Sequence, residues 1–92
     1  MEITFDPAKN ERNVRERDLS FERAGDFDFA TAHFHTEIRR GELRRVAVGY
    51  LDGRLHVLCY VPQSDGIRVI SFRRANIREA RRYGKAKTID RR

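Results

Sequence analysis

The clearest pattern along the chain is an alternation of apolar and polar residues in two adjacent segments, Leu43–Leu51 and Arg54–Val61. A period of two residues predicts β-strands with one apolar face. Between them, Asp52-Gly53 is the two-residue signal of a tight hairpin turn, so the segments are predicted to pair antiparallel. The residues predicted to share the apolar face are Val46, Val48 and Tyr50 in the first strand and Leu55, Val57, Cys59 and Val61 in the second.

Three further segments are predicted to be strands. Residues 62–66 (PQSDG) form a turn that leads into a strand at Ile67–Phe72, which extends the hairpin into a three-stranded meander. Residues 2–5 (EITF) predict a short strand, and residues 28–37 (FATAHFHT and beyond) predict a weaker one.

Two helices are predicted before the meander. Asp6-Pro7 is an N-cap followed by proline at the first helical position, so a helix should run from Pro7 to about Arg17. That segment is almost entirely polar, which predicts a surface helix. Ser20 is a second N-cap and begins a short helix that ends near Asp26.

A third helix is predicted after the meander. Asn76 and Glu79 have the spacing of a capping box, and Gly84 is placed to end the helix. Its predicted packing stripe comprises Ile77, Ala80 and either Tyr83 or Gly84.

The order of elements indicates an α+β fold: a mostly antiparallel sheet of about four strands, with two N-terminal helices and a C-terminal helix packed on it. A chain of 92 residues is expected to hold one domain, which the periodic residues place at 1–84. Residues 85–92 are basic and without apolar periodicity, so a flexible tail is expected there.

Charge is distributed unevenly along the chain. The 26 residues from Ile67 onward hold ten Lys and Arg against two acids, a net charge of +8, whereas the first 66 residues have −2. Guanidinium groups at this density repel one another unless an anion lies among them, and the phosphodiester backbone of a nucleic acid is a common one. A single cysteine and the absence of a long apolar stretch predict a cytoplasmic protein without disulfide or membrane span.

Strand alternation is expected to divide the candidate residues of the strand at 67–72 between two faces. Arg68, Ile70, Phe72 and Arg74 would share one face, and Ile67, Val69, Ser71 and Arg73 the other. Arg44 projects from the neighbouring hairpin, so Arg44, either Arg68 or Arg73, and helix residues Arg82 and Tyr83 are expected to converge on one phosphate. Arginines around a phosphate would support RNA cleavage without a metal, because the 2′-hydroxyl of the substrate supplies the nucleophile. Glu79 would act either as a base or as an orienting group for a guanidinium.

His33, His35 and Glu37 form the closest approach to a metal-ligand pattern, because residues two apart on a strand point the same way. The pattern HxHxE is short and unspecific, and an exposed polar edge is the preferred interpretation. No metal and no other cofactor is predicted.

Three ordered segments resemble the BrnT-type toxins of bacterial type II toxin-antitoxin modules. They are FDPAKNERNVRERDLSFERA near the start, LRRVAVGYLDGRLHVLCYV in the hairpin and IRVISFRRANIREARRYG at the end, and together they span residues 3–84. The positions that match the family motifs are Lys9, Asn13, Phe21, Arg44, Gly49, Arg68, Ser71, Arg73, Ala75, Glu79 and Tyr83.

The resemblance implies a RelE-like fold and an endoribonuclease that inhibits translation by cleaving RNA, free or ribosome-bound. It also implies neutralisation by a cognate antitoxin, a BrnA-like ribbon-helix-helix protein through which alone operator DNA would be contacted. The candidate catalytic residues are Arg44, Arg68, Ser71, Arg73, Glu79 and Tyr83. The candidate RNA-binding residues are Lys9, Arg74, Arg78, Arg81, Arg82 and Lys85.

Two other functions remain open from the residues alone. The same basic surface would suit a non-catalytic nucleic-acid-binding or regulatory module, which uses its arginines only for phosphate contacts. The fold would also suit a docking platform for an antitoxin within a repressor complex.

Overall fold

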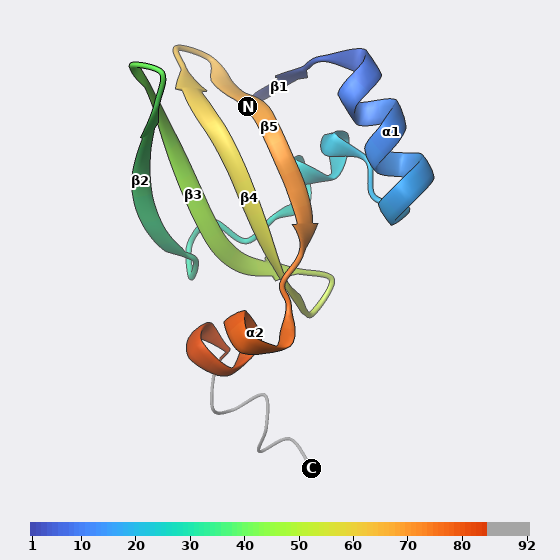
Figure 1. Ribbon diagram of the computed structural model, residues 1–92, viewed down its shortest axis with the longest axis vertical. Coiled ribbons are helices and arrows are strands. Elements are labelled where there is room, and N and C mark those ends of the chain that lie inside the picture. Colours follow the sequence, from blue (N-terminus) through green and yellow to red (C-terminus); the bar gives the residue numbers. More distant parts are fainter. Residues whose placement is uncertain (85–92) are drawn as a thin grey trace.

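The computed structural model describes residues 1–84, which form one five-stranded sheet and three helical segments (Figure 1). The elements are β1 (Glu2–Phe5), α1 (Pro7–Arg17), the 3₁₀ helix η1 (Phe21–Asp26), β2 (His33–Arg39), β3 (Glu42–Leu51), β4 (Arg54–Gln63), β5 (Gly66–Arg74) and α2 (Ile77–Tyr83). The tail predicted at 85–92 lies outside the described residues.

The strand order is β1-β5-β4-β3-β2, in which β1 runs parallel to β5 and every other pair is antiparallel. The predicted meander of β3, β4 and β5 is confirmed. Asp52 and Gly53 both have positive φ, 53° and 76°, as the predicted turn requires. Arg40 and Gly41, with φ of 52° and 78°, make an equally tight turn between β2 and β3.

The predicted helix starts are confirmed. Asp6 and Ser20 accept hydrogen bonds from the backbone N–H groups of Ala8 and Glu22, and Asn76 forms the capping box with Glu79. The predicted stripe of α2 is wrong in part, because Ile77 is 69% exposed. The helix lies at one end of the sheet and not flat on it, so only its last residue, Tyr83, packs against apolar strand residues.

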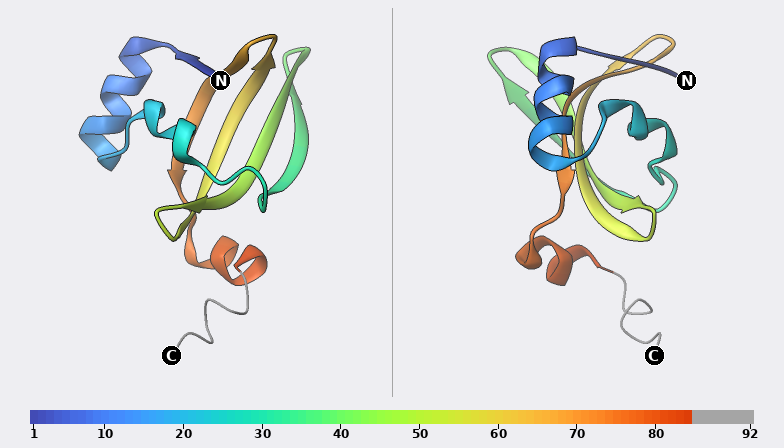
Figure 2. Two further views of the ribbon diagram at one scale, coloured as in Figure 1. Left: turned by 180° about the vertical axis from the view of Figure 1, so that it is seen from behind. Right: turned by 90° about the vertical axis from the view of Figure 1, so that its right-hand side faces the viewer.

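The strand predicted at 28–37 begins five residues later than expected, at His33. The Asp28 carboxylate accepts hydrogen bonds from the Ala30 backbone N–H at 3.1 Å and from the Thr31 hydroxyl at 2.6 Å. Such a carboxylate turn competes with extended structure. The segment therefore crosses one face of the sheet before β2 begins, as Figure 2 shows.

The face that η1 and residues 27–32 cross, here called the covered face, holds the main core. Phe72, Leu58 and Ala47 are completely buried there, and Phe27 packs edge-on against Phe72 with ring centroids 6.0 Å apart. A Cβ atom at position 49 would lie 2.8 Å from the Phe27 ring, which is too close for an ordinary contact. Glycine at this position of β3 therefore leaves the room that residues 27–32 need to cross the sheet. His56 is also buried here, against Phe72, and burial lowers the pKa of its imidazole.

The predicted alternation along β5 is wrong beyond Val69, because the strand contains a β-bulge. Val69 pairs with Tyr60 and Ser71 pairs with the adjacent Cys59, which leaves Ile70 as an extra residue. After one extra residue, every following side chain changes face. Arg68, Ser71 and Arg73 therefore share the face opposite the main core, whereas Phe72 and Arg74 turn toward the covered side.

Helix α1 is attached through a polar residue, not through an apolar stripe. Asn13, its one buried residue, donates hydrogen bonds from its amide nitrogen to the backbone carbonyls of Leu19 and Phe72, each at 2.9 Å. The pairing of β5 with β1 ends at Phe5 and Val69, so among the described residues β5 has no strand on that side at Phe72. The Asn13 amide thus occupies an edge position that another strand would otherwise fill.

None of the helices in the described part of the chain is long and apolar enough to cross a membrane.

Candidate active site

The second face of the sheet, here called the open face, combines a small apolar cluster with charged side chains. Val46, Val48, Leu55 and Val57 are buried in it, as their alternation predicts, and Tyr83 of α2 packs against them. Register places four of the predicted catalytic residues, Arg44, Arg68, Ser71 and Arg73, on strands of this face. The bulge at Ile70 is what brings Arg68 and Arg73 to the same side.

At the α2 end of the open face, Arg73 and Glu79 form a bidentate ion pair. Both guanidinium-to-carboxylate contacts measure 2.9 Å. Glu79 also accepts a hydrogen bond from the backbone N–H of Asn76 at 2.9 Å. The capping box therefore holds the Glu79 carboxylate in place, and the carboxylate in turn orients the Arg73 guanidinium. Among residues 1–84, the guanidinium makes only one further bond, a weak one of 3.3 Å to the Arg74 carbonyl, so donors remain that could bond to a phosphate.

The ion pair determines what Glu79 can do. The pKa of the Glu79 carboxyl is lowered from 4.5 to about 2, chiefly by its hydrogen bonds with Arg73, against the opposing effect of burial; the backbone N–H of Asn76 also contributes to the lowering. A carboxylate with this pKa is a weak proton acceptor at neutral pH. Of the two roles that the sequence leaves open, the geometry favours orientation of Arg73.

Stability is expected to depend on the ionisation of Glu79. Because its pKa is depressed in the folded state, its contribution is present above the unfolded value of 4.5 and is lost as pH falls toward about 2. After allowance for solvent screening, the loss should be about 1 kcal/mol. Urea unfolding of the wild type and of Glu79→Gln between pH 6 and pH 2.5 measures it. The two chains should converge at low pH, and a stability difference that does not change with pH would contradict the ion-pair account.

A cavity of about 350 Å³ lies beside this ion pair. Arg73, Glu79 and Tyr83 line it, as do the candidate RNA-binding residues Arg78 and Arg82. The Tyr83 ring contacts the His33 ring, with centroids 5.3 Å apart, and the Arg82 guanidinium lies 5.3 Å from the Tyr83 centroid.

His35 and Glu37 also line the cavity, although their HxHxE pattern was interpreted as an exposed polar edge in preference to a metal site. The His35 Nε2 atom is 3.6 Å from the Glu37 carboxylate. Histidine is the side chain best suited to accept and return a proton near neutral pH. The spacing of His35 and Glu37 on β2 indicates that they share a face of the strand. Only the pairing of β2 with β3 shows that this face is the one that carries Arg73. Within residues 1–84, no three His, Cys, Asp or Glu side chains are grouped as metal ligands.

Arg44 and Arg68 form a second cluster on the same face. Both bond to one carboxylate, that of Glu42, at 3.2 Å and 2.9 Å. No motif in the sequence marks Glu42. On β4, the partner of Arg68 is Val61 and the partner of Arg73 is Val57. Four strand residues separate them by about 13 Å. The expectation of one shared phosphate is therefore wrong for Arg44, whereas Arg73, Arg82 and Tyr83 do line one cavity. The two clusters are spaced for different phosphates.

The remaining candidates are dispersed. Ser71 lies on β5 and lines a groove beside α1, together with Lys9. Arg74 lies on the covered side, near Asp18 and His56. Arg81 is exposed on α2 and does not line the cavity, and Lys85 falls outside the described residues.

The fold and the site together define the class of protein: a small, strongly basic α+β protein with arginines along one face of its sheet. A sequence profile described as the ribonuclease toxin BrnT of type II toxin-antitoxin systems matches residues 5–79. The chain therefore belongs to the BrnT family of ribonuclease toxins, which are endoribonucleases. The match includes Arg44, Arg68, Ser71, Arg73 and Glu79 but ends before Tyr83. Membership in a type II system implies a cognate antitoxin.

A solved structure agrees in fold. The chain is similar to the crystal structure of the ribonuclease toxin BrnT of Brucella abortus, with a TM-score of 0.64 and 24% sequence identity, over 83% of this chain and 97% of that one. Comparison with curated proteins gave no match. The α+β class and the family expected from the sequence are both confirmed.

Proposed function

We propose that residues 1–84 form the toxin domain and that this ribonuclease cleaves RNA without a metal ion, at the cavity lined by Arg73, Glu79 and His35. The observation that carries the proposal is the bidentate Arg73–Glu79 pair, which presents an oriented guanidinium at the edge of the cavity. In-line attack by the substrate's own 2′-hydroxyl on the adjacent phosphorus produces a pentavalent phosphate with added negative charge. Arg73 stabilises that charge through donors that are already fixed in direction.

Proton movement is assigned to His35. Attack by the 2′-hydroxyl releases a proton, and departure of the 5′-oxygen requires one. His35 lines the cavity with Glu37 beside it, so it accepts the first proton, and either His35 or the Tyr83 hydroxyl supplies the second. The products are a 2′,3′-cyclic phosphate and a free 5′-hydroxyl, and no redox partner or cofactor is needed.

The partner is proposed to be a BrnA-like ribbon-helix-helix antitoxin that presents an acidic surface and alone contacts operator DNA. A purely apolar cover over the arginines of the open face would leave guanidiniums buried and unpaired at a cost of several kcal/mol each. The substrate is proposed to be RNA, free or on the ribosome, with inhibition of translation as the result.

Cleavage of a defined RNA by purified protein in excess EDTA tests the function. Cleavage should persist at an unchanged rate, and the products should carry cyclic phosphates. RNA that stays intact but is retained tightly in a salt-dependent way would instead support a non-catalytic phosphate-binding module. Cleavage that EDTA abolishes and added Mg²⁺ restores would reject the metal-free mechanism.

A further inference from the structure

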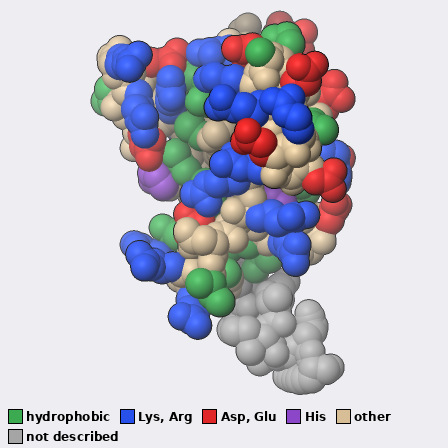
Figure 3. Space-filling model, turned by 45° about the vertical axis from the view of Figure 1, so that its right-hand side comes forward, with side chains coloured by type: hydrophobic (Ala, Val, Ile, Leu, Met, Phe, Trp, Pro, Cys, Tyr) green, Lys and Arg blue, Asp and Glu red, His purple; other side chains and the backbone are tan. Residues whose placement is uncertain are grey.

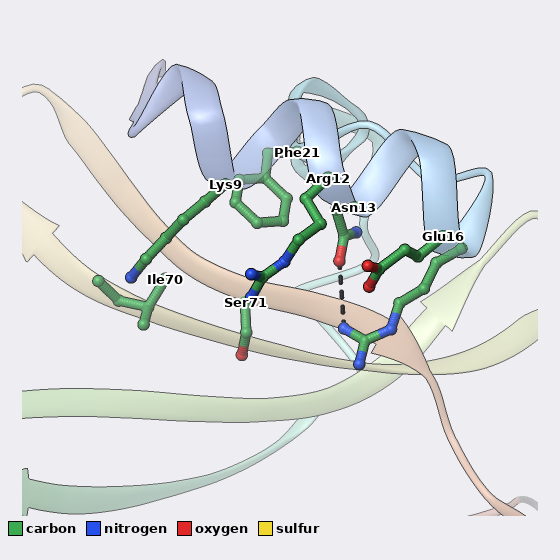
Figure 4. A pocket seen from close by; sticks show the side chains of 8 residues that line it. Lys9, Arg12, Asn13, Glu16, Phe21, Ile70 and Ser71 are labelled. Atoms are coloured by element: carbon green, nitrogen blue, oxygen red, sulfur yellow. Dashed lines mark hydrogen bonds between the residues drawn. The ribbon is translucent and has the colours of Figure 1, made fainter.

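A second hollow of the molecule lies away from the Arg73 cavity, between α1 and the edge of β5. Its volume is about 250 Å³, and Lys9, Arg12, Glu16 and Arg17 of α1 line it together with Ile70 and Ser71 of β5. Figure 4 shows the α1 side chains extending from the helix toward the strand. This hollow is called the α1 groove below.

The α1 groove has an unbalanced positive charge. Three cations line it against the single carboxylate of Glu16, and no described acidic side chain forms an ion pair with any of the three. Figure 3 shows Lys and Arg side chains gathered across this side of the molecule. Cations brought together without ion-pair partners bind an anion favourably, because the anion removes their mutual repulsion.

The groove is also held in a fixed shape. The Arg17 guanidinium donates a hydrogen bond to the Asn13 side-chain oxygen at 3.1 Å, and the nitrogen of the same amide bonds to the Phe72 carbonyl of β5. One buried amide therefore sets both the distance between α1 and β5 and the direction of Arg17. A preformed site loses less entropy when a ligand binds.

The bulge of β5 connects the groove to the open face. Ile70 and Ser71, the residues at the bulge, line the groove. Ser71 is paired with Cys59, a residue of the open face, and lies two residues before Arg73. Two strand residues correspond to about 7 Å. An extended ligand that leaves the Arg73 cavity along β5 thus reaches the groove without crossing the core.

The chemistry of the lining distinguishes an RNA strand from an acidic protein. Protein interfaces rely on apolar anchors at their centre. The apolar lining of the groove is small: Ile70 is partly buried, and the aromatic residue Phe21 is only 2% exposed. Val14 is an exposed apolar residue of α1 but does not line the groove, and the exposed residues Ile38 and Leu43 lie on the β2–β3 hairpin, at the other edge of the sheet. Cations with a serine hydroxyl and no exposed aromatic anchor suit a phosphodiester backbone.

We propose that the α1 groove is a second phosphate-binding subsite, which holds the RNA backbone a few nucleotides from the bond cleaved at Arg73. This inference rests on the proposed function, because it assigns the rest of the same substrate. Lys9 and Arg12 contact phosphates, Arg17 is positioned by Asn13 to do so, and Ser71 donates a hydrogen bond where the strand passes the bulge. Glu16 limits affinity, so that the cleaved product leaves.

Three substitutions on α1 test the subsite. The probe is a 2′-O-methyl RNA of about ten nucleotides, which spans such a site and cannot be cleaved by its own hydroxyl. Arg12→Ala should raise the dissociation constant about fivefold and reduce the slope of log affinity against log salt by about one. Glu16→Gln should strengthen binding. Arg15→Ala removes the same charge from an exposed position of the same helix outside the groove and should have little effect.

Kinetics separate this subsite from the active site. Arg12→Ala should raise KM for a long RNA with kcat unchanged, and it should leave cleavage of a dinucleotide unaffected. Equal effects of Arg12→Ala and Arg15→Ala would mean general charge attraction and would overturn the proposal. Weaker binding of a polyglutamate peptide by Arg12→Ala, with RNA binding unchanged, would assign the groove to an acidic protein. A wild type that binds the probe as expected but never cleaves RNA would reject the proposed function and leave the subsite standing.

Discussion

Replacing Arg73 by alanine is expected to lower kcat for RNA cleavage about 100- to 1,000-fold, the usual loss when one oriented donor to a transition-state charge is removed. The reason is geometric as well as electrostatic. Glu79 holds the guanidinium through two contacts of 2.9 Å, so its remaining donors need no reorientation when charge develops on the phosphate. Single-turnover cleavage of a short RNA measures the effect without contributions from product release.

Lysine is not expected to replace Arg73. It carries the charge, but one ammonium group cannot make the parallel bonds that fix the fork. Arg73→Lys should therefore recover no more than about a tenth of the lost activity. Arg73→Lys with full activity would show that position 73 requires only a positive charge and would contradict the orienting role of Glu79.

The neighbouring residue provides a matched control. Arg74→Ala removes the same group one position along β5, but Arg74 lies on the covered side near Asp18 and His56. Its kcat should stay within about twofold of the wild type, with any change confined to long-range attraction of RNA. Thermal unfolding of each variant distinguishes a lost donor from a lost fold. Equal losses at positions 73 and 74 would mean that the face assigned to Arg73 is wrong.

Replacing Phe72 by alanine is expected to have the largest effect on stability, about 3–5 kcal/mol. Phe72 is completely buried between the Phe27 and His56 rings, and its backbone carbonyl anchors Asn13 of α1. A domain of this size has only about 5–15 kcal/mol of net stability, so the variant should be unfolded or nearly so at 37 °C. Urea unfolding followed by circular dichroism measures the change.

Phe34→Ala is the control for Phe72→Ala. The Phe34 side chain is 40% exposed and covers the Arg45 guanidinium at 5.1 Å, outside the core. Its loss should cost less than about 1.5 kcal/mol. Phe72→Leu, which keeps most of the buried volume, should fold and retain cleavage. A Phe72→Ala chain as stable as Phe34→Ala would place the core elsewhere.

The sequence predicts the structure best at the helix ends and turns. The Asp6, Ser20 and Asn76 caps and the Asp52-Gly53 turn were predicted correctly, because each depends on a hydrogen bond or backbone angle within four residues. The alternation of β3 and β4 also predicted which residues share the open face, but it missed the opposite face, whose Ala47, Leu51, Leu58 and Tyr60 belong to the main core. Residues 28–32 were misassigned, because a single aspartate side chain redirects the backbone there.

The candidate site was predicted in part. The sequence indicated Arg44, Arg68, Arg73 and Glu79 as site residues and predicted the Asn76–Glu79 capping box. Its alternation, however, predicted that Arg68 and Arg73 lie on opposite faces of β5. One extra residue at Ile70 reverses that division, and no local signal in the sequence ISFRR marks it. Glu42 and the cavity position of His35 were missed, because each depends on which strands are neighbours.

By itself, the sequence determined the α+β class, the family and the concentration of positive charge after residue 66. These follow from local propensities, periodicity and motif spacing, which are encoded over short stretches. The tertiary structure alone decided which arginines act together: Arg73 with Glu79, Arg44 and Arg68 on Glu42, and the cations of α1 beside the β5 bulge. Strand register and the docking of α1 through Asn13 are set by contacts between distant residues, so they appear only when the chain is folded.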